Sequence, residues 1–282
     1  MPGITHSPSA ILFFLILALV EWRWRSRHGA RGYDWRASLA SLGIGAGQFM
    51  LRPVTAAVLT GVYSGAHHIA LFRLPVDDWR VWVAGFFAVE FTYYWFHRWS
   101  HMVNWLWATH AVHHSANEIT LPAAIRLGWT NIISGGWLLF LGLVLIGFPP
   151  LLVVGLLGAN LLYQYPLHTE AIRKLGPLEW VFNTPSHHRA HHASDAAYLD
   201  CNFGGVLIVF DRLFGTLRIE PDGGGLRYGL VAPITGYNPF AIAFSQWRVM
   251  LAALAVATSW RQRLTVLFGR PAALDQILAI RQ

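Results

Sequence analysis

HRWSH at residues 97–101 opens a series of histidine-bearing stretches that continues with HAVHH at 110–114, PLHTE at 166–170 and SHHRAHH at 186–192. Together these stretches hold ten of the fourteen histidines in the chain. Imidazole is a common ligand for iron, zinc, copper and nickel, and one zinc site needs only about three or four protein ligands. Ten histidines therefore predict two metal ions. The candidate ligands are His97, His101, His110, His113, His114, His168, His187, His188, His191 and His192.

The spacing of these histidines indicates helices. Residues three and four apart lie on one face of an α-helix, so the HxxxH and HxxHH spacings predict clusters of imidazoles that each point in one direction. Thr184, Pro185 and Ser186 form a helix-start signal directly before the last cluster. His67 and His68 lie apart from the series, and we expect them to be ordinary loop residues.

The composition is that of a membrane protein. The chain has 282 residues, of which 55% are hydrophobic and 12% charged, whereas soluble domains carry about 25% charged residues. Its mean hydropathy is +0.41. The net charge of +7 suits cytoplasmic loops beside anionic headgroups, and nothing in the sequence favours nucleic-acid binding. The single cysteine, Cys201, excludes an intrachain disulfide and a zinc ribbon, and we expect it to be a packing residue.

Apolar stretches predict about four to five membrane spans. They cover residues 9–22, 38–62 and 77–96, and a Gly/Pro break at 147–150 divides the stretch 130–165 into two spans with a tight turn. The positive-inside rule places the arginine-rich loop 23–36 in the cytoplasm. If each predicted span crosses the membrane once, the chain returns to the cytoplasm before each histidine stretch, so the histidines lie on the same side as this loop. The predicted fold class is an all-α, multi-pass integral membrane protein with a cytoplasmic, histidine-rich di-metal helical cap.

The remaining segments complete a single predicted domain over residues 1–282, with a catalytic region at about 85–235. Residues 203–216 are apolar but too short for a span, so we expect them to pack against the metal site or enter the membrane interface. Residues 240–260 predict a helix along the surface. Metal-bound histidines usually donate their second ring N–H to an acceptor. The candidate acceptors are Asn160, Glu170, Asp195 and Asp200.

A site built almost wholly from imidazole at the end of membrane helices suits an oxygenase. Two ferrous ions can jointly reduce O2 to an oxidant that attacks an unactivated C–H bond, and a lipid tail can reach such a site without leaving the bilayer. The protein orients the substrate and excludes water, so we expect no catalytic residue beyond the metal ligands. The alternative is a non-catalytic metal-binding or metal-transporting membrane protein, which would place polar residues within its spans.

Several motifs resemble the fatty acid hydroxylase and sterol desaturase superfamily, whose histidine boxes look like HRWSH, HAVHH and HHRAHH. YYWFHRWSH, LLYQYPLHTE, LGPLEWVFNTPSHHRAHH and NFGGVLIVFDRLFGT, with the later YGL and NPF, resemble its alkylglycerol monooxygenase branch. The resemblance covers roughly residues 90–240. It implies a membrane-bound di-iron oxygenase acting on a lipid. It assigns metal ligation to His97, His101, His110, His113, His114, His188, His191 and His192, with His168 as an isolated extra ligand. His187 stays open, because HxxHH is complete without it.

The chain departs from this branch at two positions. Met102 follows the first box, where alkylglycerol monooxygenases carry a glutamate, and Cys201 stands where they carry a lysine. Ether-cleaving members of the branch use tetrahydrobiopterin, so the electron donor is either this pterin or an external redox partner. The other expected partners are O2 and a lipid from the bilayer. Hydroxylation, desaturation and hydroxylation beside an ether oxygen remain open as outcomes, on an ether lipid or a sterol-like substrate.

Overall fold

A computed structural model describes residues 8–28 and 32–279, and over these ranges the chain is helical without a β-strand. The predicted all-α class is thereby confirmed. The α-helices are α1 Pro8–Arg27, α2 Trp35–His68, α3 Trp79–Met102, α4 Asn104–His110, α5 Asn131–Ser134, α6 Leu138–Ile146, α7 Pro150–Gln164, α8 Pro185–His191, α9 Val209–Phe214, α10 Pro239–Ala243, α11 Ser245–Val256, α12 Trp260–Phe268 and α13 Ala272–Ala279. The short 3₁₀ helices are η2 His113–Ser115, η3 Ala123–Ile125, η4 Tyr165–Leu167, η5 Gly176–Trp180 and η6 Ala196–Tyr198.

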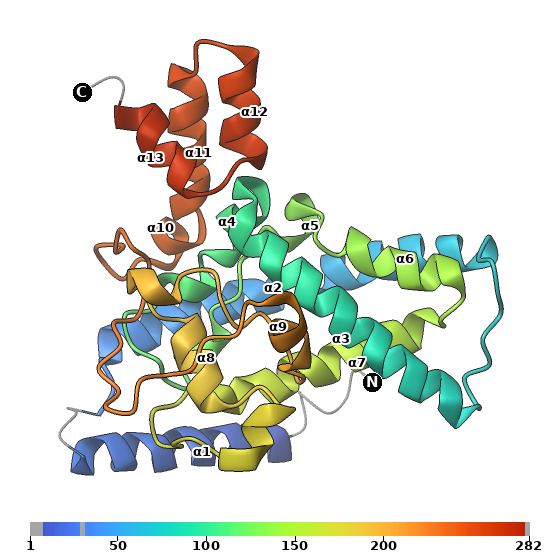
Figure 1. Cartoon of the computed structure of the whole chain (residues 1–282), viewed down its shortest axis with the longest axis horizontal. Helices are drawn as coiled ribbons and strands as arrows, with labels where there is room; N and C mark the ends of the chain where they lie inside the picture. Colours follow the sequence, from blue (N-terminus) through green and yellow to red (C-terminus); the bar gives the residue numbers. More distant parts are fainter. Residues whose placement is uncertain (1–7, 29–31, 280–282) are drawn as a thin grey trace.

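The helices α2, α3, α6 and α7 form the elongated arm on the right of Figure 1. Asp34 and Asp78 begin α2 and α3 as N-caps. The Asp34 carboxylate accepts hydrogen bonds from two backbone N–H groups of the first turn, and the Asp78 carboxylate accepts one, from Arg80. α3 packs against α6 and α7, and α2 packs against the same pair. Their shared core consists of Tyr63, Val81, Val89, Tyr93, Phe140, Leu143, Val144, Phe148, Leu152 and Val153.

The turn between α6 and α7 depends on Gly147, whose φ of 133° is rarely adopted by residues with a side chain. A Cβ there would also lie 2.7 Å from the Phe72 carbonyl oxygen. The segment that follows α2 runs along this turn. Its Leu71 and Phe72 amides donate hydrogen bonds to carbonyls at the end of α6, at 2.9 and 3.1 Å. The predicted turn therefore forms, and it is fastened to a second segment.

Several boundaries differ from the sequence prediction. α1 continues to Arg27, so the first part of the predicted arginine loop is helical. α2 continues to His68, so His67 and His68 occupy its last turn instead of a loop. α6 has nine residues, about 14 Å of helix, which is too short to cross a bilayer. Among the residues that the structure describes, two segments are long and apolar enough to do so: Trp35–His68 and Pro150–Leu167.

Polar contacts tie α1 to the loops around the histidines. Arg25, in the predicted arginine loop, is buried, and its guanidinium contacts the Glu170 and Glu118 carboxylates at 2.6 and 3.3 Å. Glu21 accepts hydrogen bonds from the Leu121 amide and from the Thr169 hydroxyl. The last turns of α1 therefore fix the segment that follows the second histidine stretch and the end of the third stretch.

The C-terminal helices α11, α12 and α13 project from the rest of the chain at the top of Figure 1. They pack on one another and on α4. Ala108 of α4 and Met250 of α11 belong to their common core. Residues 240–260, predicted as one helix, are divided between α10 and α11. This bundle supports the helix that presents His110.

Candidate metal centre

The candidate ligands come from five separate elements. His97 and His101 lie on the last two turns of α3, and His110 is the final residue of α4. A turn follows, so His113 and His114 belong to the separate helix η2. The remaining ligands lie after η4 or on α8 and its C-cap: His168, His188, His191 and His192. HAVHH is thus not one continuous α-helix.

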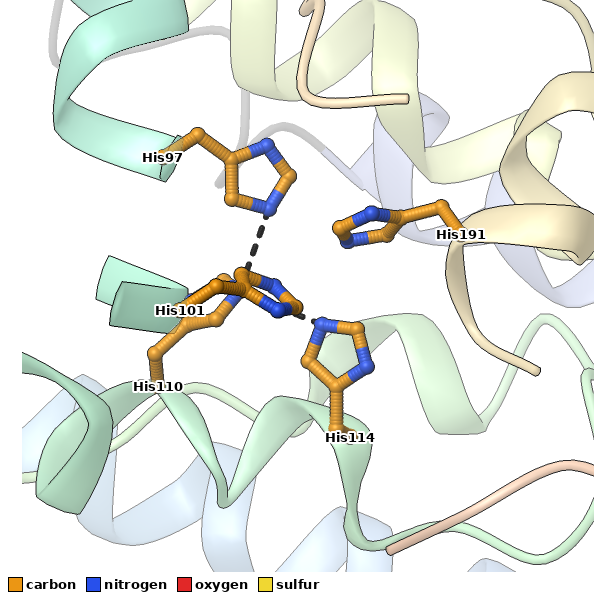
Figure 2. Close-up of side chains that lie close together, drawn as sticks. All are labelled: His97, His101, His110, His114 and His191. Carbon is orange, nitrogen blue, oxygen red and sulfur yellow. Dashed lines mark hydrogen bonds between the residues drawn. The ribbon is translucent and has the colours of Figure 1, made fainter. Parts of the chain in front are cut away.

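The structure gathers nine of the ten histidines into two groups. One ring nitrogen from each member lies within 4.8 Å of the others in its group. The five-histidine group, shown in Figure 2, comprises His97, His101, His110, His114 and His191. The four-histidine group comprises His113, His168, His188 and His192.

The division corrects the expectation that each cluster points in one direction. HRWSH behaves as predicted, because both of its histidines enter the five-histidine group. In HAVHH, however, His113 and His114 enter different groups, and His191 and His192 separate in the same way. Adjacent residues on a helix lie about 100° apart, so one short element serves both groups.

The distances between ring nitrogens fit metal coordination. His97 Nε2 lies 3.1 Å from His110 Nε2, which lies 3.2 Å from His114 Nε2. In the other group, the His168 and His188 Nε2 atoms are 3.0 Å apart. Two ligands at about 2.1 Å from one ion and at right angles are about 3.0 Å apart. The donor set therefore matches two ions, one in each group.

Backbone carbonyls orient three of the rings. The Nδ1–H groups of His97 and His191 donate to the carbonyl oxygens of Phe203 and Cys201, at 2.9 and 2.8 Å. His168 Nδ1–H donates to the Gln164 carbonyl at 3.0 Å. Each bond fixes the tautomer and leaves the Nε2 lone pair facing the group, as in metal-bound histidines.

Burial keeps these imidazoles neutral, which is the form that binds metal. It lowers the pKa of His113 and of His191 to about 3 and that of His168 to about 4. The Nε2 atoms of His101 and His191 are buried without a hydrogen-bond partner. A buried polar atom without a partner is costly, and a metal ion would satisfy both atoms.

His187 lies outside both groups. Its ring is fully buried on α8, and Nδ1 lies 3.4 Å from the Thr184 hydroxyl. His67 and His68, at the far end of α2, also belong to neither group. The resemblance left His187 open, and the geometry separates it from its neighbour His188.

The predicted side-chain acceptors contribute little to the two groups. Asn160 donates to Glu90 at 2.6 Å, and Asp195 pairs with Arg227 at 2.9 Å. Glu170 contacts Arg25, as described above. Asp200 comes nearest, with Oδ1 3.6 Å from His101 Nδ1. The observed acceptors are main-chain carbonyls, and residue type gives no signal for the direction of a carbonyl.

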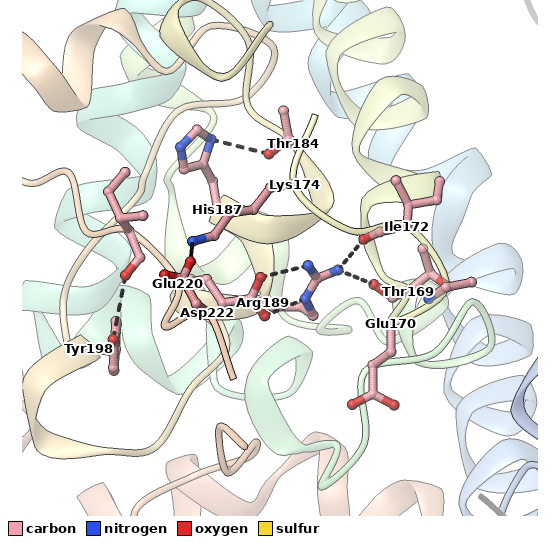
Figure 3. A network of polar contacts seen from close by, with 12 residues as sticks. Thr169, Glu170, Ile172, Lys174, Thr184, His187, Arg189, Tyr198, Glu220 and Asp222 are labelled. Carbon is pink, nitrogen blue, oxygen red and sulfur yellow. Dashed lines mark hydrogen bonds and ion pairs between the residues drawn. The ribbon is translucent and has the colours of Figure 1, made fainter. Parts of the chain in front are cut away.

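Arg189 anchors the helix that carries the last histidines. Figure 3 shows its guanidinium in a two-pronged ion pair with Glu220, at 2.6 and 2.7 Å. The same side chain donates to the carbonyls of Thr169 and Ile172, at 2.8 and 2.7 Å. Both partners of the ion pair are buried. Arg189 thus locks α8 to the segment that follows His168.

Residues 82–216, which include all nine grouped histidines, match the family model for fatty acid hydroxylase. The resemblance predicted from the histidine motifs is thereby confirmed. Across 270 residues the chain is 33% identical to the alkylglycerol monooxygenase of Xenopus tropicalis, covering 93% of this chain and 58% of that protein.

Two further relatives show the range of the similarity. The human alkylglycerol monooxygenase is 39% identical over 201 residues, 71% of this chain and 44% of the relative. The ornithine lipid hydroxylase OlsE of Rhizobium tropici is 29% identical over 155 residues, 54% of this chain and 46% of the relative. The chain spans about half the length of the curated relatives it matches. No solved structure matches it.

Proposed function

We propose that this chain is a multi-pass membrane oxygenase that holds two iron ions and uses O2 to hydroxylate a C–H bond of a lipid. The observation that carries the proposal is the pair of buried imidazole groups, of five and four members, inside the region that matches the family model for fatty acid hydroxylase. The relatives named as lipid monooxygenase and lipid hydroxylase support the reaction class. In this proposal residues 1–282 form one domain, with the catalytic region at about 85–235.

When bound, the two iron ions supply the reduction of O2 and the oxidation of the C–H bond. The chain contributes ligands in a fixed tautomer, since carbonyl acceptors hold His97, His168 and His191. It also excludes water, because the rings of His188 and His191 are buried. The nine grouped histidines are the proposed ligands, and His187 is not among them.

Exposed apolar helix surface supports a membrane location. In the most apolar window of α2 only 6% of residues are buried within the protein, whereas a core helix of a soluble protein would bury such residues. Large side chains such as Phe49, Met50 and Val54 are exposed along it. Residues 9–22 and 77–96 are proposed as further spans, with the metal centre on the cytoplasmic side.

The substrate class follows from similarity and position. Glycerol lipids with an ether-linked alkyl chain are the first candidates, because two relatives named alkylglycerol monooxygenase align over most of this chain. An alkyl chain in the bilayer can approach the end of α3, where His97 and His101 lie. With Met102 in place of a glutamate, we propose a redox partner protein as the electron donor, with tetrahydrobiopterin as the alternative.

Incubation of membranes with ¹⁸O2 and defined lipids tests this proposal. Membranes with the wild-type chain should incorporate one ¹⁸O atom into an alkylglycerol, measured by mass spectrometry of the product or of its aldehyde. His113→Ala membranes are the control and should form no product. Incorporation of ¹⁸O into acyl lipids or sterols alone would show that the substrate is not an ether-linked glycerol lipid. Absence of any lipid product, combined with metal uptake into vesicles, would support metal transport instead.

A further inference from the structure

Asp211, on α9, is fully buried and lies outside both histidine groups. Its Oδ1 accepts hydrogen bonds from the Phe203 amide at 2.7 Å and from the Thr216 hydroxyl at 2.6 Å. Its Oδ2 accepts from the Gly204 amide at 2.7 Å. This buried carboxylate has no direct contact with a histidine, yet its bonds are as short as charge-assisted hydrogen bonds usually are.

The Gly204 amide and the Phe203 carbonyl belong to the same peptide group. The amide donates to Asp211, and the carbonyl accepts the Nδ1–H of His97 at 2.9 Å. A trans peptide directs its N–H and C=O to opposite sides, so the three groups form one chain of hydrogen bonds. Such chains strengthen cooperatively, because each bond polarises the next.

We propose that Asp211 is a positioning residue that acts on His97 through the Phe203–Gly204 peptide. Its negative charge polarises the peptide, strengthens the carbonyl as an acceptor, and so orients the imidazole and raises the basicity of its Nε2. In many metal sites a carboxylate accepts the ring N–H directly; here a peptide group stands between them. This inference rests on the proposed metal centre.

The local sequence supports the arrangement. A Cβ at Gly204 would lie 2.2 Å from the Leu207 carbonyl oxygen and 3.0 Å from Asp211 Oδ2. Only glycine therefore lets this peptide approach the carboxylate. At Gly205 a Cβ would lie 1.9 Å from Asn160 Nδ2. The two glycines allow the loop to be held tightly from both sides.

Glu90, on α3, provides a matched control. Its carboxylate is also buried, and its Oε2 accepts from the amides of Val206 and Leu207 at 2.9 and 3.0 Å. The carbonyl of the second of these peptides accepts from the Asn183 amide, at 2.8 Å, instead of from a histidine. Removing either charge loosens the same loop, but the Asp211 charge is joined to a ring of the metal centre by a single peptide group. Glu90 has only a longer link, through the Asn160 side chain to Gln164, whose carbonyl accepts from His168.

The test compares Asp211→Asn and Glu90→Gln in the full chain, purified in detergent and loaded with Co²⁺. Bound metal is counted by elemental analysis, its affinity is measured by chelator competition, and its environment by visible ligand-field absorption. In Asp211→Asn, one of two ions should bind about 10- to 100-fold more weakly and its absorption bands should shift. Glu90→Gln should change affinity by less than about 3-fold and leave the bands in place.

A second variant covers the case in which Asp211→Asn does not fold. Thr216→Val removes the hydroxyl that fixes the same carboxylate and should weaken one ion by about 2- to 10-fold. His97→Ala is the reference variant, because it removes the imidazole on which Asp211 is proposed to act. Equal effects of Asp211→Asn and Glu90→Gln, with two ions in the wild type and fewer in His97→Ala, would overturn the role of Asp211. A wild-type chain that binds no metal would instead overturn the proposed function.

Discussion

The rings of His191 and His192 stand at 90° with their centroids 5.2 Å apart, and they belong to different histidine groups. One step along the chain thus passes from one proposed metal to the other. His113 and His114 repeat this relationship at the same angle, with centroids 5.5 Å apart. Because α8 and η2 each serve both groups, the two proposed ions are neighbours.

Single substitutions should therefore remove different ions. His191→Ala removes a ligand from the five-histidine group and His192→Ala from the four-histidine group, leaving four and three. Each should therefore weaken the binding of a different ion, so that a chelator removes about one ion from either variant under conditions in which the wild type keeps two. Both should abolish lipid oxidation. His187→Ala, with its ring outside the groups, should retain both ions. Elemental analysis of purified variants checks this, and loss of an ion from His187→Ala would contradict the assignment.

The buried ion pair between Arg189 and Glu220 should be important for stability. Arg189→Ala leaves a buried carboxylate without its partner, which we expect to lower the free energy of unfolding by about 3–5 kcal/mol. The control is Arg227→Ala, whose side chain is 78% exposed in its pair with Asp195 and should cost about 1 kcal/mol or less. Unfolding in mixed micelles measures both changes; equal changes would refute this account.

Asp211 should give the metal-free protein a defined pH dependence. Burial raises its pKa from 3.8 to about 6, so the folded chain holds this proton more tightly than the unfolded chain does. The stabilising contribution is complete below about pH 4 and is lost as the pH rises through about 6. Relative to Asp211→Asn, wild-type stability should fall by up to about 3 kcal/mol over this range. If the stability of the wild type relative to Asp211→Asn rose with pH over this range, the raised pKa of Asp211 would be contradicted.

Topology can be tested with introduced cysteines, because the native Cys201 is buried. Ser64 is exposed near the end of α2, and Ala197 is exposed five residues after His192 of the metal centre. With the centre in the cytoplasm, an impermeant maleimide applied to intact cells should label Ser64→Cys and not Ala197→Cys. Permeabilised cells, in which both should react, provide the control. The reverse pattern would place the centre on the outer side.

The sequence predicted the helical class, the break at Gly147 and the histidine series because each depends on local residue type. Grouping of the histidines was less predictable, since the turn after His110 and the separation of His191 from His192 depend on how α3, α4 and α8 meet. The roles of Glu21 and Asp211 were also missed. A lone acidic residue in an apolar stretch signals burial, but the sequence does not reveal its partners. The Leu121 amide that Glu21 binds is 100 residues away, and the amides that Asp211 binds are 7 and 8 residues away.

The most direct test of the central claim is the iron content of catalytically active protein. The chain should be produced with iron available, purified in detergent, and assayed for lipid oxidation and for metal by elemental analysis of the same sample. Nine imidazoles in two groups predict close to two iron ions per active chain, and activity that rises with occupancy of the second site. A fully active preparation that reproducibly contains one metal ion per chain would contradict the account.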